Sequence, residues 1–187
     1  ANFHDALRPM GRIALTSILR YRAARAMAHF YELLAETQAW ESYLGAAERI
    51  ADSVIVRLRR DDGWLMAATQ VDRQPDLWST SRAVYEGLLA GELARRACEA
   101  MLAAYRQGTL AACGYLRHTP TSADVRPGEQ LWEHGEAPGQ GGYGIYQNGG
   151  YWPQPLGYFV YALAQVDEAA AREISCEFID HTREHAA

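Results

Sequence analysis

The chain has 187 residues, of which 49% are hydrophobic and 22% charged. This balance excludes a disordered protein, and the length suits one domain, residues 1–187. The net charge of −5 gives no reason to expect nucleic acid or an anionic membrane as a partner. No apolar run is long enough to cross a bilayer and residues 1–10 lack the apolar core of a signal peptide. Three cysteines at wide spacing fit a reducing compartment, so we expect a cytoplasmic protein. The alternative, that a signal peptide has been removed, stays open because the chain begins with Ala1 and not with Met.

Hydrophobic periodicity predicts two long helices in the first third of the chain. The first covers about residues 12–35 and the second about residues 38–60, where apolar residues recur at alternating steps of three and four. Thr37 is the predicted N-cap of the second helix. Asp61-Asp62-Gly63 ends it.

Two further helices are expected between Asp76 and Gly108. Asp76 suits the N-cap of the first, Gly91 marks a break, and Gly108 suits the end of the second. Residues 109–150 lack helical periodicity, and their later part is rich in glycine and proline. A connection of this length is more often functional or disordered than inert.

Two further helices are predicted at the C-terminal end of the chain. Pro153 and Pro155 suit the first turn of the fifth helix, and Asp167 suits the N-cap of the sixth. No segment has a convincing strand pattern. The expected fold is therefore all-α, with three antiparallel helical hairpins and a long Gly/Pro-rich loop.

The run Tyr146 to Pro153, YQNGGYWP, is the most informative stretch of the sequence. It places aromatic rings and side-chain amides at the start of a helix. Flat apolar rings cover the C–H faces of a sugar, and amides both donate and accept hydrogen bonds with its hydroxyls. We therefore expect residues 109–152 to carry a saccharide site.

With these motifs the chain resembles the six-hairpin glycosidase superfamily, the (α/α)6 toroids that include debranching-type glucosidases and α-L-rhamnosidases. The similar pieces come in the family's order: DLWST at 76–80, AVYEGL at 83–88, GYLRH at 114–118, Trp132 and YQNGGYWP at 146–153. The resemblance implies the C-terminal half of a toroid, because twelve helices with their connections need roughly 300 residues. The chain is then either a fragment or a natural half-barrel.

Glycoside hydrolysis needs two carboxyl groups, and the candidates are Asp76, Glu133 and Glu136. For Asp76 the competing role is the N-cap, and for the two glutamates a solvated loop charge. The candidates for substrate contact are aromatic, amide and histidine side chains: Trp78, His118, Trp132, His134, Gln147, Asn148, Tyr151 and Trp152. For the aromatic residues the competing role is the core, and for Asn148 a turn.

His181 and His185 stand four residues apart within an H-x-x-E-H pattern, the spacing of two zinc ligands on a helix. The chain ends two residues later, which leaves no downstream third ligand. We expect no metal and no cofactor.

The function expected from these features is carbohydrate recognition in a glycoside-hydrolase-like protein, with acid/base cleavage of a glycosidic bond if the site is complete. One alternative is a saccharide-binding or self-associating half-barrel without catalysis, and another is a toroid related to the sugar 2-epimerases. Because half a toroid exposes an apolar flank, we expect a homodimer if the chain is complete, with the first and last hairpins at the interface.

Overall fold

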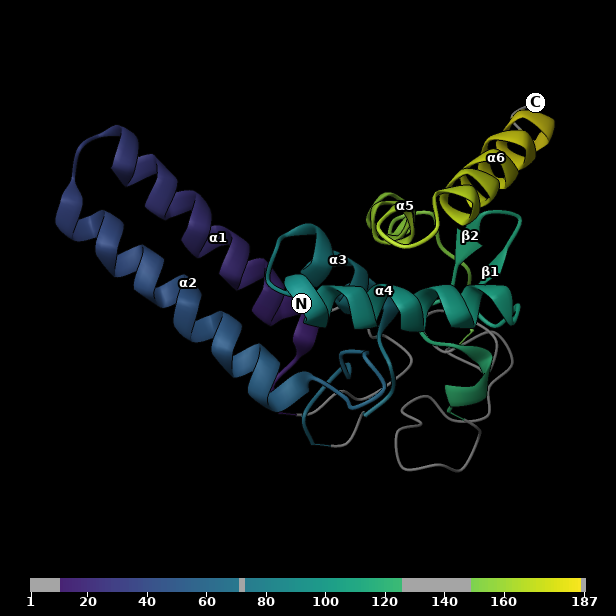
Figure 1. Cartoon of the computed structure of the whole chain (residues 1–187), viewed down its shortest axis with the longest axis horizontal. Coiled ribbons are helices and arrows are strands. Elements are labelled where there is room, and N and C mark those ends of the chain that lie inside the picture. Colours follow the sequence, from purple (N-terminus) through teal and green to yellow (C-terminus); the bar gives the residue numbers. More distant parts are fainter. Residues whose placement is uncertain (1–10, 71–72, 126–148, 186–187) are drawn as a thin grey trace, which may run out of the picture.

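The computed structural model describes residues 11–70, 73–125 and 149–185. These ranges are mostly helical, which confirms the predicted all-α class (Figure 1). The elements in chain order are α1 (Ala14–Leu33), α2 (Thr37–Leu58), α3 (Leu77–Tyr85), α4 (Gly91–Arg106), β1 (Ala111–Ala112), β2 (Tyr115–Leu116), the 3-10 helix η1 (Thr121–Ala123), α5 (Leu156–Ala164) and α6 (Glu168–His185). No helix in the described ranges combines the length and the apolarity that crossing a bilayer requires.

Helices α1 and α2 form a long hairpin that extends away from the other helices (Figure 1). Its buried side chains include the alanines Ala24 and Ala28 of α1 and Ala47 of α2, which let the two backbones pack closely at these positions. Tyr31 and Tyr43 stack across it, with ring centroids 5.5 Å apart.

The turn of this hairpin differs from the sequence-based expectation. The amides of Ala35 and Glu36 donate to the carbonyls of Glu32 and Tyr31, and Ala35 has a φ of 57°, which together make a Schellman ending for α1. This tight ending brings the chain directly into α2. The prediction of Thr37 as N-cap is wrong, because Thr37 is already the first helical residue and Glu36 occupies the cap position without a side-chain hydrogen bond.

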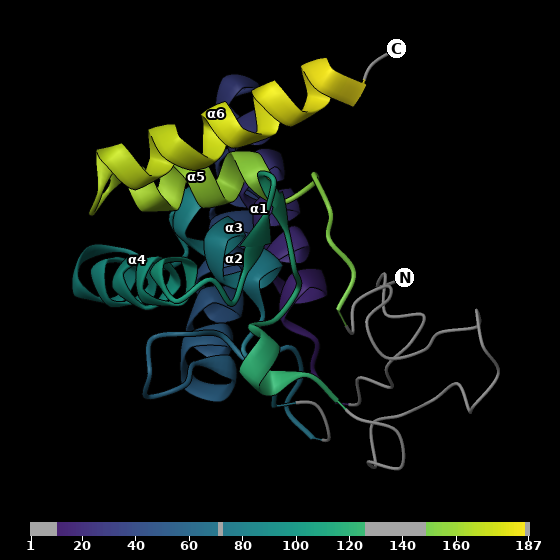
Figure 2. The same ribbon diagram turned by 90° about the vertical axis from the view of Figure 1, so that its right-hand side faces the viewer.

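The six helices pack in pairs. Helices α2, α4 and α6 each contact the odd-numbered helix before them, while α1 contacts α3 and α3 contacts α5. Figure 2 shows α6 lying along α5. The odd-numbered helices therefore follow one another in space, and each has a partner.

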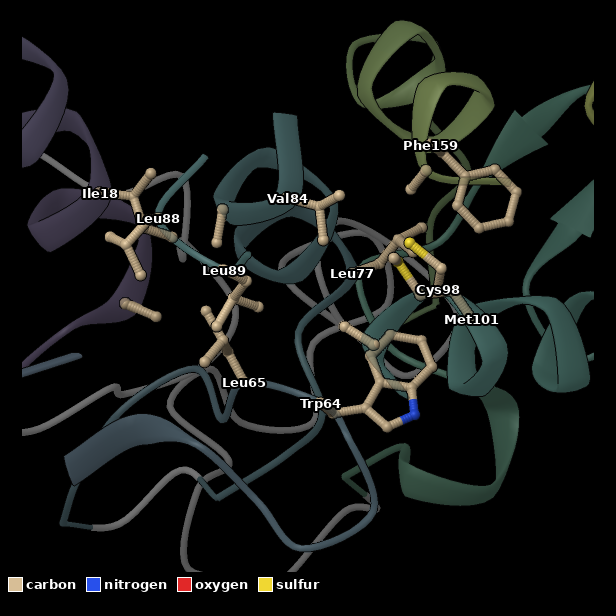
Figure 3. Packing of buried hydrophobic residues seen from close by; sticks show 14 of the residues in the cluster. Ile18, Trp64, Leu65, Leu77, Val84, Leu88, Leu89, Cys98, Met101 and Phe159 are labelled. Atoms are coloured by element: carbon tan, nitrogen blue, oxygen red, sulfur yellow. The ribbon is translucent and has the colours of Figure 1, made fainter. Parts of the chain in front are cut away.

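The core draws buried side chains from all six helices, and part of it lies where α3, α4 and α5 meet. Phe159 of α5 packs near Cys98 and Met101 of α4, all fully buried, and Trp64 lies on the opposite side of this cluster (Figure 3). Burial raises the pKa of the Cys98 thiol to about 11, which keeps it protonated at neutral pH.

The expectation of no strands is wrong in one place, since β1 and β2 pair antiparallel over two residues each. Their turn has positive φ at both Cys113 (51°) and Gly114 (76°), the pattern of a type I′ hairpin. A Cβ on Gly114 would lie 2.4 Å from the Phe178 Cβ of α6. Glycine therefore permits both the turn and the contact with α6.

The predictions for the starts of α5 and α6 have different outcomes. Asp167 caps α6, because its carboxylate accepts the Ala170 amide at 3.0 Å. Pro155 occupies the N-cap position of α5 and Pro153 precedes it, so neither lies in the first turn. Helix α5 therefore begins slightly later than predicted.

Candidate functional site

Asp76 organises the start of α3. Its carboxylate accepts the amides of Trp78 at 3.0 Å and Ser79 at 3.3 Å, and it also accepts the Ser79 hydroxyl. The side chain is buried. The predicted N-cap role is thus confirmed, while a catalytic role for Asp76 stays a prediction.

His118 lies against the same helix start. Its carbonyl accepts the Leu77 amide at 2.7 Å, and its Nδ1 lies 3.7 Å from an Asp76 carboxylate oxygen. The Trp78 ring stacks on the His118 ring, with centroids 4.2 Å apart and planes 17° apart. Three residues that the sequence singled out separately, Asp76, Trp78 and His118, therefore form one cluster.

The segment before His118 brings in the YQNGGYWP motif. Leu116 and Trp152 exchange backbone hydrogen bonds of 2.9 and 2.7 Å. The buried Arg117 forms an ion pair with Asp124, whose side chain is 6% exposed. It also donates to the Gly149 carbonyl at 3.0 Å and lies 5.4 Å from the Tyr151 ring centroid. Two motifs more than thirty residues apart in the sequence are thereby joined.

A cavity of about 260 Å³ opens beside this cluster, between α1, α3 and α5. Trp78 and Arg82 of α3 line it with Gln154 and Tyr158, which stand at the start of α5, and Leu15, Leu19 and Pro155 complete its lining. The Arg82 guanidinium lies 4.9 Å from the Tyr158 ring centroid and 3.3 Å from the Glu86 carboxylate. We call this the Trp78 cavity.

Arg82, Gln154 and Tyr158 were not among the residues predicted for the site. For Arg82 a signal was present, because Trp78 and Arg82 are four residues apart in one helix, whereas Gln154 precedes α5 and offered no such signal. Residues at this spacing share one side of a helix. Neither Tyr151 nor Trp152 lines the Trp78 cavity, although both lie beside its supporting segment.

The lining of the Trp78 cavity contains no Asp or Glu among the described residues. The nearby carboxylate of Glu86 is engaged by Arg82 and, at 3.6 Å, by Arg22. The other predicted site residues lie outside the described ranges: Trp132, Glu133, His134, Glu136, Gln147 and Asn148.

Metal chemistry finds no support in the described part of the chain. No group of three or more His, Cys, Asp or Glu side chains there has the geometry to hold a metal ion. The rings of His181 and His185 lie 4.2 Å apart at the end of α6, and a ring nitrogen of His185 lies 2.9 Å from the His181 carbonyl.

Comparison of the chain with protein families, with curated proteins and with solved structures gives no match. The functional argument therefore rests on the geometry of the Trp78 cavity and of its surroundings.

Proposed function

We propose that this chain binds a saccharide in the Trp78 cavity, as part of a glycoside-hydrolase-like protein. The observation that carries the proposal is the composition of the cavity wall, which combines two aromatic rings, one guanidinium and one amide. Aromatic rings favour the C–H faces of sugars, while amide and guanidinium groups hydrogen-bond to hydroxyls.

The positions of Trp78 and Gln154 in the cavity wall support saccharide binding. Trp78 is half-buried, and its stack on His118 fixes the plane of the indole. Gln154 is exposed, and its amide makes no hydrogen bond to any described residue, so it is available to a ligand. The volume of about 260 Å³ lies just below the roughly 300–1,000 Å³ of pockets for drug-sized ligands, which suits a single hexose unit.

Binding without cleavage is the form of this function that the geometry favours. Hydrolysis by the common routes needs two carboxyl groups that flank the scissile bond. None lines the Trp78 cavity among the described residues, and the Asp76 carboxylate is occupied in capping α3. Glu133 and Glu136 remain the candidates for a complete hydrolytic site. His118 does not line the cavity, which disfavours an epimerase that works through histidine.

We extend the proposal to assembly as half of an (α/α)6 toroid that forms a homodimer. Helices α1, α3 and α5 in sequence, each with an outer partner, are compatible with half of such a ring. Phe30, Leu33 and Leu34 at the tip of the first hairpin and Ile179 on α6 are exposed, and a second copy would cover them. Light scattering on the full chain tests this, and a stable monomer at high micromolar concentration would contradict it.

Calorimetric titration with neutral saccharides (glucose, rhamnose and maltose) tests the binding proposal. We expect Trp78→Ala to weaken binding about tenfold or more, because an aromatic stack contributes on the order of 1 kcal/mol beyond its buried area. Gln154→Ala should also weaken binding, and it leaves the core intact because Gln154 is exposed.

Tyr161→Ala is the matched control. Tyr161 is exposed on α5, contacts Tyr85 edge-on and does not line the cavity, so the variant should bind as the parent does. Unchanged affinity in both Trp78→Ala and Gln154→Ala, with the fold retained, would overturn the proposal.

A further inference from the structure

A second cavity, of about 600 Å³, lies between α1 and α2. Arg12, Thr16 and Arg20 line it from the α1 side, and Ala46, Arg49 and Ser53 line it from α2. No Asp or Glu lines it among the residues that the structure describes. We call it the arginine cavity.

Two of its three arginines have no counter-ion within the described part of the chain. Arg20 and Arg49 form no ion pair and no hydrogen bond with any residue in the described ranges, and Arg12 donates to the Ser53 hydroxyl at 2.8 Å. Elsewhere in the molecule an arginine commonly faces a carboxylate, as in the pairs Arg60–Asp62, Arg95–Glu92, Arg106–Asp167 and Arg172–Glu168.

The arrangement of these side chains concentrates positive charge in one place. Arg12 lies just before α1 and Arg20 lies on it, and both line the cavity together with Arg49 of α2. Gly45, one turn before Arg49, leaves room for its guanidinium, since an added Cβ would lie 3.3 Å from Nη1. In a chain of net charge −5, three arginines around one cavity make a local site for an anion.

The chemistry of the lining selects the kind of anion. Guanidinium groups bind phosphate and carboxylate oxygens through paired hydrogen bonds, and the Ser53 hydroxyl offers one more polar contact. The cavity, of about 600 Å³, is far larger than a phosphate ion. The excess volume accommodates an organic group attached to the anion.

We propose that the arginine cavity binds a small phosphomonoester, such as a sugar phosphate, with Arg12, Arg20 and Arg49 around its phosphate group. The site shares none of its lining residues with the Trp78 cavity. It therefore stands independently of the saccharide proposal.

Calorimetric titration of the full chain with glucose 6-phosphate, inorganic phosphate and glucose tests this inference. Glucose 6-phosphate should bind, and glucose should give no binding that depends on the arginines. Arg20→Gln and Arg49→Gln should each weaken phosphate-dependent binding by about tenfold, because hydrogen bonds to charged groups are the stronger class. Binding should also weaken as sodium chloride is raised from 20 to about 200 mM.

Arg57→Gln is the matched control, because Arg57 is exposed on the same helix, has no described ion pair and does not line the cavity. All three arginines are exposed, so their substitution leaves folding intact, which circular dichroism verifies.

Equal affinity for inorganic phosphate and glucose 6-phosphate would show that the phosphate group alone is recognised, and tighter binding of the ester would show that the organic part contributes. Absence of binding at millimolar concentrations, or equal loss in Arg57→Gln and Arg20→Gln, would overturn the inference. Loss of neutral-sugar binding in Trp78→Ala would not affect it.

Discussion

Polar side chains are buried around the start of α3 but not in the α1–α2 hairpin. All seven buried polar or charged residues of the described ranges lie in or beside α3 or in the segment after β2: Asp76, Ser79, Thr80, Ser81, Arg117, His118 and Thr119. No charged, amide, serine or threonine side chain of α1 or α2 is buried. The arginines of the hairpin are exposed, whereas the polar groups around the start of α3 are buried.

The difference shows how each region is held in place. Buried polar groups cost free energy unless they are paired, so the partners around Asp76 and Arg117 fix the position of each group. These contacts hold together segments that the chain separates widely, and they orient Trp78. The arginines of the hairpin are not held by such partners, so they can bind a ligand with little rearrangement of the surrounding structure.

The largest expected effect comes from breaking the buried Arg117–Asp124 pair. Asp124→Ala leaves a buried guanidinium without its charge partner, and we expect the free energy of unfolding to fall by about 3–5 kcal/mol. Urea denaturation measures this. Asp180→Ala is the control, because its pair with Arg183 is 69–77% exposed and should change stability by less than about 1 kcal/mol. A similar small loss in both variants would show that burial does not distinguish the two regions.

A smaller effect is expected at the cap of α3. Asp76→Ala removes the acceptor for two backbone amides and a buried hydroxyl, and we expect a loss of about 2 kcal/mol. Asp76→Asn keeps an amide oxygen as acceptor and should lose less than about 1 kcal/mol. Thermal unfolding of both variants checks the difference. If Asp76→Asn keeps the fold but abolishes cleavage of a glycoside, the carboxylate has a catalytic role as well.

The smallest effect is expected at the half-buried cap of α6. The backbone amide of Ala170, followed by Arg106, lowers the pKa of Asp167 below its ordinary value of 3.8. The stability from this carboxylate is therefore present above pH 3.8 and is lost as the pH falls through the lower pKa of the folded state. The melting temperature of Asp167→Asn should lie slightly below that of the parent at pH 6, and the gap should shrink toward pH 3. A gap that stays constant over this range would contradict the assignment.

Local rules predicted most of the helix positions and two of the caps. The apolar spacing gave both long helices of the first hairpin to within about two residues, and Asp76 and Asp167 cap α3 and α6 as predicted. Thr37 failed as a cap because the Schellman ending of α1 is closed by the backbone, which side-chain identity does not reveal. The two-residue strands were missed because so short a pairing leaves no periodic pattern.

The sequence by itself determined the helical class, the order of the elements and the importance of Asp76, Trp78 and His118 as separate candidates. Periodicity and capping are local, so each depends on residues within a few positions of one another. Only the tertiary structure joined these three residues, placed Gln154 and Tyr158 opposite Trp78 and Arg82, and gathered Arg12, Arg20 and Arg49 around one cavity. Such groupings depend on how α1, α3 and α5 pack, and packing is set by many weak contacts between distant parts of the chain.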